Sequence, residues 1–212
     1  EAPGGAPGEA PLKGLAPRDG EVVLLASRLL EEVRKIEGVP PETLASLAAA
    51  GSYTPLILEA DGAAGADLKV PGPGEPVIPD ITSTVVAVTG LPALGADIGK
   101  ARVHRREMLE NLFPGERRLS PSLLAALLAH PEGAFKGAPK AARKIWLINK
   151  ADGPREMARA KAFAEEVCRE LRGSPGEMGP ELLVVGSLRS GALAAKELLP
   201  YYVHRERKDG AF

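Results

Sequence analysis

The most specific polar string in the sequence is Asn149-Lys150-Ala151-Asp152, which has the form N-K-x-D. In that form the carboxylate accepts two hydrogen bonds from guanine, the lysine stem covers the base and the asparagine braces the loop. The same string suits the start of a helix, with Asp152 as the capping residue before Gly153-Pro154. Guanine recognition and helix capping therefore both stay open. Ser187, after the apolar run 182–185, is a candidate for a second loop beside the base.

Two carboxylates follow an earlier apolar run, in Glu59-Ala60-Asp61-Gly62. This order resembles a Walker B segment, in which a carboxylate holds Mg²⁺ through water molecules. Glu59 and Asp61 are two residues apart, so their side chains share one side of an extended segment. An ordinary Asp-Gly turn is the alternative. We therefore consider Glu59 and Asp61 candidate catalytic residues, and Asp61 the candidate metal ligand.

The phosphate loop that normally accompanies such residues, G-x-x-x-x-G-K-[ST], is absent from the sequence. Its nearest counterpart, residues 95–101, has the wrong spacing and no hydroxyl residue in the required place. Cationic side chains are nevertheless plentiful, and they either hold an anionic ligand or form a solvated surface. They are Lys69 and Lys136, beside turns rich in proline or glycine, and the group Lys100, Arg102, His104, Arg105 and Arg106.

The composition narrows the classes of partner. The chain has 212 residues, and 27 Lys and Arg against 28 Asp and Glu give a net charge of −1. With only 4% aromatic residues, this balance does not indicate a nucleic-acid partner. A single cysteine excludes an internal disulfide, and Cys168 lies on the apolar stripe of an expected helix, which predicts a buried, unreactive thiol. The apolar runs are too short to span a membrane and no signal peptide is recognisable, so we expect a cytoplasmic protein.

Apolar runs alternate with helical patterns along the chain, and this alternation predicts the strands and helices that would position these residues. The runs are apolar on both faces, as in parallel strands covered by helices, and they span 22–26, 56–58, 84–88, 145–148 and 182–185. Helical patterns begin at Pro41, cover 120–128 and 154–172, and run from Ser190 to Leu198.

This order of elements predicts an α/β fold with a doubly wound, mostly parallel sheet and helices on both faces. We expect a single domain over residues 21–212, preceded by a Pro/Gly-rich loop or linker at residues 1–20. Ligands of such sheets bind outside the carboxyl ends of the strands. Because the segments 59–62 and 149–152 and Ser187 all follow expected strands, they should gather along one edge.

Several ordered blocks of the sequence resemble the YqeC family. The blocks lie at 58–65, 68–71, 75–79, 89–95, 103–105, 133–139 and 147–152. Members of that family are regarded as accessory proteins of selenium-dependent molybdenum hydroxylases, resemble P-loop nucleotide-binding proteins and usually begin with a loop G-G-G-G-K-T-T. This sequence lacks that loop, which either lies upstream of Glu1 or is lost. Arg106 stands where the family commonly has proline.

The resemblance implies a P-loop NTPase-like fold and a nucleotide-binding maturation factor. Such a factor would use GTP or ATP with Mg²⁺, and would control the handover of a selenium or molybdenum cofactor species to a hydroxylase or its maturation factors. In this role Asp61 would act on Mg²⁺. The base would contact Asn149, Lys150, Asp152 and Ser187. The phosphates or an anionic cofactor would face Gly62, Lys69, His104, Arg105, Lys136 and Gly137. A non-catalytic binding or chaperone module of the same fold is the alternative, and NTP hydrolysis stays an open question.

Overall fold

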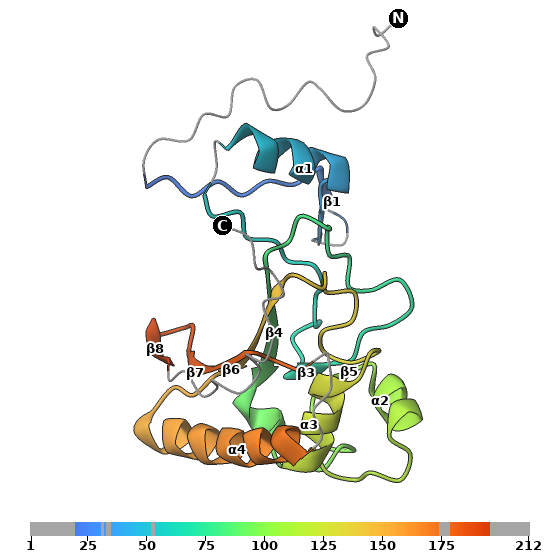
Figure 1. The fold of residues 1–212 in the computed structure, drawn as a ribbon, viewed down its shortest axis with the longest axis vertical. Coiled ribbons are helices and arrows are strands. Elements are labelled where there is room, and N and C mark those ends of the chain that lie inside the picture. Colours follow the sequence, from blue (N-terminus) through green and yellow to red (C-terminus); the bar gives the residue numbers. More distant parts are fainter. Residues whose placement is uncertain (1–19, 31, 33–34, 52–53, 174–178, 196–212) are drawn as a thin grey trace, which may run out of the picture. The chain divides into compact units, whose positions relative to one another are not determined.

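The computed structural model describes residues 20–30, 32, 35–51, 54–173 and 179–195 of the chain (Figure 1). It divides into two compact units, Glu1–Glu59 (unit 1) and Ala60–Phe212 (unit 2). This division falls inside the region that the sequence analysis assigns to one domain. The predicted linker at 1–20 lies almost wholly outside the described residues and stays a prediction.

Unit 1 contains a short hairpin and one helix. Strand β1 (Arg28–Leu30) pairs antiparallel with β2 (Lys35–Glu37). Helix α1 (Pro41–Ala50) starts at the predicted proline, whose fixed φ suits the first helical position, and ends at Gly51 with φ 64°. The helix predicted from Pro41 is therefore confirmed.

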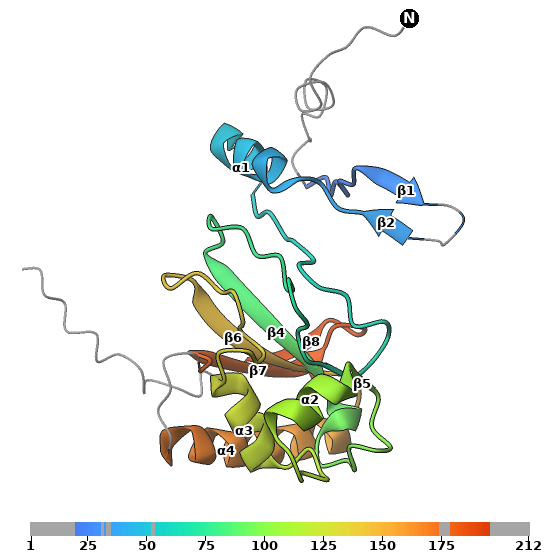
Figure 2. The same ribbon diagram turned by 90° about the vertical axis from the view of Figure 1, so that its right-hand side faces the viewer.

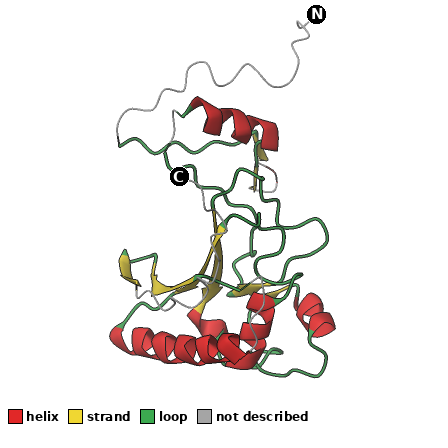
Figure 3. Cartoon of the chain, in the orientation of Figure 1, coloured by secondary structure: helices red, strands yellow, loops and turns green. Residues whose placement is uncertain are grey.

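Two of the predicted strands are wrong. Residues 22–26 and 56–58 form loop rather than strand (Figure 3), and Val22 and Ile57 are 95% and 88% exposed. Both runs are apolar, but a strand also needs a hydrogen-bonded neighbour, and none of the described strands pairs with either run. An apolar run by itself cannot say whether such a neighbour exists.

Unit 2 is built on a four-stranded sheet in the order β4-β6-β7-β8. Strands β4 (Thr84–Gly90), β6 (Arg143–Asn149) and β7 (Leu182–Ser187) run parallel, with Val88 opposite Leu147 and Leu147 opposite Val184. All three match runs that the sequence predicts as strands. The α/β class and the mostly parallel sheet are thereby confirmed.

The last strand corrects a predicted helix. Strand β8 (Ala192–Ala195) pairs antiparallel with β7, where the sequence analysis expects a helix from Ser190 to Leu198. Alanine and leucine favour helices, but Gly191 with φ 70° reverses the chain and delivers the segment to the free edge of β7. Pairing with β7 therefore overrides the local preference. The remainder of the predicted helix, 196–198, lies outside the described residues.

Helices cover one side of this sheet. Helices α3 (Pro121–Ala129) and α4 (Pro154–Gly173) pack together beneath it, and α2 (Arg106–Leu112) lies on the same side (Figures 1 and 2). Trp146 and Ile148 are 0% exposed, whereas Val86 and Val88 of β4 are 48% and 51% exposed. The expected second helical layer is thus not found among the described helices of unit 2.

Helices α3 and α4 begin and pack as predicted. The side chain of Ser120 accepts a hydrogen bond from Leu123 N, which caps α3 ahead of its N1 proline. The apolar stripe of α4 is buried, with Ala160, Ala164 and Val167 at 0% exposure. No described helix is long and apolar enough to cross a membrane.

Short elements complete unit 2. Strands β3 (Leu68–Lys69) and β5 (Val103–His104) pair parallel, and the 3-10 turn η2 (Leu91–Ala93) follows β4. Gly90 N donates to Asp67 O at 2.6 Å, so the segment leading into β3 meets the carboxyl end of β4. Through that contact, β3 and β5 carry their polar residues to the same edge of the sheet.

Candidate functional site

The carboxyl ends of the parallel strands β4, β6 and β7 gather polar residues along one edge, as expected for 149–152 and Ser187, whereas the segment 59–62 does not follow a strand. The register sets Gly90 at the end of β4 beside Asn149 at the end of β6. Ala151 N donates to Gly186 O at 3.1 Å, which ties the loop after β6 to β7. Asp67 joins this edge through its contact with Gly90.

The predicted base-contacting residues come together there. Asn149 Oδ1 accepts from Lys150 N at 2.8 Å and from Leu188 N at 3.0 Å, so this side chain braces two loops at once. Ser187 Oγ donates to Asp152 Oδ1 at 2.5 Å. We call Asn149, Lys150, Asp152 and Ser187 the base-side cluster. The structure shows their juxtaposition, and their role in binding a base stays a prediction.

Lys150 is fixed by a residue that the sequence analysis does not single out. Its Nζ donates to the carboxylate of Asp67, whose side chain is 7% exposed, while that of Lys150 is 43% exposed. A Cβ at Gly90 would lie 2.7 Å from Asp67 Oδ1, so only glycine leaves room for this carboxylate. Asp67 precedes Leu68-Lys69 and shares one side of an extended segment with Lys69, which is the one signal that could have found it.

A second group of charged residues forms a chain of ion pairs. Lys69 Nζ contacts the carboxylate of Asp61, the Gly62 carbonyl at 2.8 Å and Glu75 Oε2 at 2.9 Å. Arg105 Nη2 donates to Glu75 Oε1 at 2.8 Å. We call Asp61, Lys69, Glu75 and Arg105 the ion-pair chain. Each of the four comes from a different block of sequence, which is why no single string reveals the group.

A third cation, Lys136, reaches the loop that carries Glu75. Its Nζ donates to the Gly72 carbonyl at 3.1 Å and pairs with Glu132 at 2.7 Å. A Cβ at Gly72 would lie 1.5 Å from Arg105 Nη1, so the guanidinium rests directly against this glycine. Lys136 and Arg105 thus meet at one residue, and Gly137 follows at the turn.

The remaining candidates are less involved. His104 lies opposite Lys69 in the β3–β5 pair, and its carbonyl accepts from Val70 N at 3.3 Å. Glu59 is exposed and belongs to unit 1, so its predicted pairing with Asp61 stays a prediction. The cationic group at 100–106 does not act as one surface, because Lys100, Arg102 and Arg106 are exposed while Arg105 turns to Glu75.

Strained backbone marks both groups of residues. Among the described residues, the non-glycine positions with positive φ are Ala64 at 48°, Arg105 at 60° and Lys150 at 68°. Such conformations cost about 1–3 kcal/mol each and concentrate at functional sites. Arg105 belongs to the ion-pair chain, Lys150 to the base-side cluster, and Ala64 to the loop between Asp61 and β3.

Charge and burial shift two pKa values. The ammonium of Lys69 lowers the pKa of the Glu75 carboxyl most, burial opposes it, and the guanidinium of Arg105 lowers it further, so that the pKa lies below its ordinary value. Burial raises the pKa of the Cys168 thiol, whose residue is 4% exposed. The predicted buried thiol is therefore confirmed, while Glu75 is ionised at neutral pH.

A magnesium site made of protein side chains alone does not fit this arrangement. The Asp61 carboxylate is paired with the Lys69 ammonium, which a metal ion would have to displace. In the described part of the chain, no group of three or more acidic, histidine or cysteine side chains could hold a metal ion. The metal role of Asp61 thus stays a prediction that depends on oxygens from a ligand.

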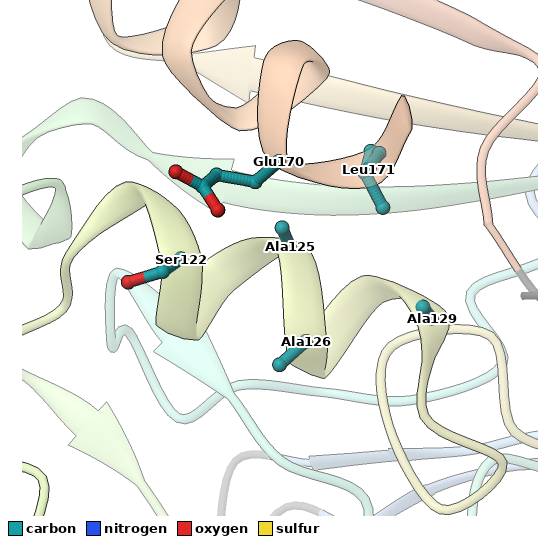
Figure 4. A pocket seen from close by; sticks show the side chains of 6 residues that line it. All are labelled: Ser122, Ala125, Ala126, Ala129, Glu170 and Leu171. Carbon is teal, nitrogen blue, oxygen red and sulfur yellow. The ribbon is translucent and has the colours of Figure 1, made fainter. Parts of the chain in front are cut away.

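One pocket lies away from these residues. It has a volume of about 240 Å³ and is lined by Ser122, Ala125, Ala126 and Ala129 of α3 and by Glu170 and Leu171 of α4 (Figure 4). Leu171 is near the end of α4 opposite to Pro154, about 25 Å along the helix axis. None of the predicted site residues lines this pocket.

Comparisons with known proteins bear on the ion-pair chain more than on the base-side cluster. A family model described as YqeC protein matches residues 12–107, which include Asp61, Lys69, Glu75 and Arg105. A relative from Escherichia coli (strain K12), named "Uncharacterized protein YqeC", is 36% identical over 118 residues. That alignment covers 55% of this chain and 46% of the relative, so the chain spans about half of the relative's length. No solved structure matches. The family model and the relative agree, and over these residues the chain is similar to the YqeC family.

Proposed function

We propose that this protein binds a guanine nucleotide at the carboxyl ends of β6 and β7. The observation that carries the proposal is the bracing of two loops by Asn149 Oδ1, which sets the Asp152 carboxylate beside Ser187. In this arrangement Asp152 accepts from the base, the stem of Lys150 covers it, and Asp67 holds the Lys150 ammonium in place. Lys69, His104, Arg105 and Lys136 face the phosphates or another anionic group.

The wider role follows from the family. We propose that the protein is an accessory factor for a selenium-dependent molybdenum hydroxylase, in which nucleotide binding controls the handover of a selenium or molybdenum cofactor species. A reconstitution assay tests this role: adding the protein with GTP should raise the fraction of active hydroxylase formed from its unmatured form. An unchanged fraction, with the protein shown to bind GTP, would contradict the accessory role and leave nucleotide binding intact.

A second candidate function is a binding module without NTP chemistry. One observation favours it: the carboxylate of Asp61 pairs with Lys69 instead of standing open to a metal ion. Such a module would still bind nucleotide at the base-side cluster. Release of phosphate from bound GTP separates the two candidates, because the module releases none.

Asp152→Asn tests base recognition. An asparagine amide donates where the carboxylate accepts, so preference should move from GTP toward XTP by about tenfold or more, since a mismatch at a buried edge costs about 1–3 kcal/mol. As a helix cap, asparagine would serve equally well and change nothing. The measurement is calorimetric titration of both proteins with GTP, ATP and XTP.

The matched control is Glu156→Gln, which removes one exposed carboxylate from the first turn of α4, the helix that follows Asp152. It should leave the order of the three affinities unchanged. If wild type and Asp152→Asn rank the nucleotides identically, guanine recognition by Asp152 is wrong.

A further inference from the structure

Glu75 is held between two cations that come from different elements. Lys69 of β3 lies 2.9 Å from Oε2, and Arg105, just before α2, donates to Oε1 at 2.8 Å. Each carboxylate oxygen therefore faces its own cation. Proteins also bind phosphate-like groups by placing two cationic side chains against one small oxyanion.

The Glu75 carboxylate does not use all the hydrogen-bond donors that Lys69 and Arg105 offer. Glu75 Oε2 is fully covered and has no hydrogen-bond partner, so its approach to Lys69 is an ion pair without hydrogen-bond geometry. Arg105 carries five N–H groups, and one of its terminal nitrogens donates to Glu75. A tetrahedral oxyanion, with four oxygens, can accept from both cations in more directions than a planar carboxylate can.

The surroundings keep the two cations in place without Glu75. Lys69 also contacts Asp61 and the Gly62 carbonyl, and Arg105 rests against Gly72 in a strained backbone conformation with φ 60°. Lys136 holds the Gly72 carbonyl at 3.1 Å. The site would therefore persist if the Glu75 side chain moved away.

Charge counting shows what occupant the site accepts. Asp61 and Glu75 balance Lys69 and Arg105, so the ion-pair chain is neutral with Glu75 present. Without the Glu75 carboxylate the same group carries one excess positive charge, with Lys136 nearby. An anion of the size of phosphate would restore the balance.

We infer that Lys69 and Arg105 form a binding site for a phosphate-like oxyanion, and that Glu75 is an internal competitor for it. The oxyanion takes the two cations, and Glu75 is released toward solvent with its neighbours in the loop between β3 and β4. This inference rests on the proposed function for one source of the oxyanion, the phosphates of a nucleotide. Free inorganic phosphate is the other source with the same chemistry.

Glu75→Gln tests the competition, because it keeps the shape of the side chain and removes its charge. Binding of inorganic phosphate and of pyrophosphate, measured by calorimetry at fixed ionic strength, should become tighter by about threefold or more, the gain expected when a competing partly exposed ion pair is removed. Arg105→Ala should abolish the gain. A merely structural ion pair would give unchanged or weaker binding, and that result would overturn the inference.

Two controls keep the result interpretable. Glu116→Gln makes the same change of charge at an exposed carboxylate outside the ion-pair chain, and should leave phosphate affinity unchanged. Glu75→Asp retains the charge but shortens the reach, so it should bind phosphate with an affinity between those of wild type and Glu75→Gln. An affinity outside that interval would count against competition.

Additional measurements distinguish nucleotide phosphate from a free oxyanion, and separate the oxyanion site from base recognition. Equal tightening of GTP and pyrophosphate by Glu75→Gln, with guanosine unaffected, identifies nucleotide phosphate. Tightening of inorganic phosphate with no change for GTP identifies a free oxyanion. If phosphate binding tightens but the protein does not discriminate GTP from ATP, base recognition fails and this site stands. If GTP is preferred and Glu75→Gln changes neither ligand, this site fails alone.

Discussion

The base-side cluster and the ion-pair chain are held together in different ways. Asn149, Asp152 and Ser187 are fixed by hydrogen bonds between loops that continue directly from paired strands. Asp61, Lys69, Glu75 and Arg105 are fixed mainly by opposite charges across loops and a two-residue strand. The first group depends on the sheet, and the second depends on the state of ionisation.

This difference assigns different tasks to the two groups. Donors and acceptors set on rigid strand ends suit the reading of a planar base, because their directions are fixed in advance. Side chains held by partly exposed charges can exchange partners at low cost, which suits the exchange of an internal carboxylate for a ligand. The two groups adjoin at β3, where Asp67 serves the first and Lys69 the second.

Gly90→Ala should be the strongest single disruption of the base side. Its Cβ would meet Asp67 at 2.7 Å from Oδ1 and 3.2 Å from Cα, so backbone must move. Overpacking of this kind costs about 2–3 kcal/mol. Denaturant unfolding should show the loss, whereas Gly38→Ala, where nothing lies within 4 Å, should unfold like wild type. Equal stability of both variants would mean that Asp67 and Gly90 are not tightly packed.

The Lys150–Asp67 pair should respond asymmetrically to removal of either partner. Lys150→Met leaves a carboxylate that is 7% exposed without its cation, and should cost about 1–2 kcal/mol. Asp67→Asn leaves an ammonium that is 43% exposed and can turn to water, so it should cost less than about 1 kcal/mol. Urea unfolding of both variants checks the order, and the reverse order would contradict burial of Asp67.

The smallest expected effect is a pH dependence confined to the ion-pair chain. Because the folded-state pKa of Glu75 is lowered, its ion pairs contribute stability that is complete above the ordinary glutamate pKa of about 4.3. That contribution is lost as the pH falls through the lowered pKa. The difference in Tm between wild type and Glu75→Gln should therefore shrink in acid and at high salt. A difference that is constant from neutral to acidic pH would show that charge does not hold this loop.

The sequence predicts the parts of the fold in which local pattern and pairing agree. Strands β4, β6 and β7 are apolar on both faces and lie side by side, so the pattern identifies them. Residues 22–26 have the same apolar character but no described partner strand, and β8 has helical composition but pairs with β7. Pairing is a property of the whole chain, and a local window does not contain it.

The residues of the candidate site also fall into those that a local sequence pattern predicts and those that it does not. The base-side cluster was predictable because N-K-x-D is contiguous and directly follows a strand. Glu75 reaches an arginine 30 residues away, and Asp67 reaches a lysine 83 residues away. Neither acid carries a string of its own, so only the folded chain reveals these partners.

The left-handed backbone at Arg105 and Lys150 has a consequence for directed evolution. At φ 60° and 68° glycine would relieve strain that a longer residue must bear. A selection for heat resistance alone would therefore draw Arg105, whose ion pair is partly exposed, toward glycine, but would keep Lys150, whose partner Asp67 is buried; a selection for ligand binding would hold both as cations. Sequencing the survivors of the two selections would separate the residues that serve the fold from those that serve the ligand.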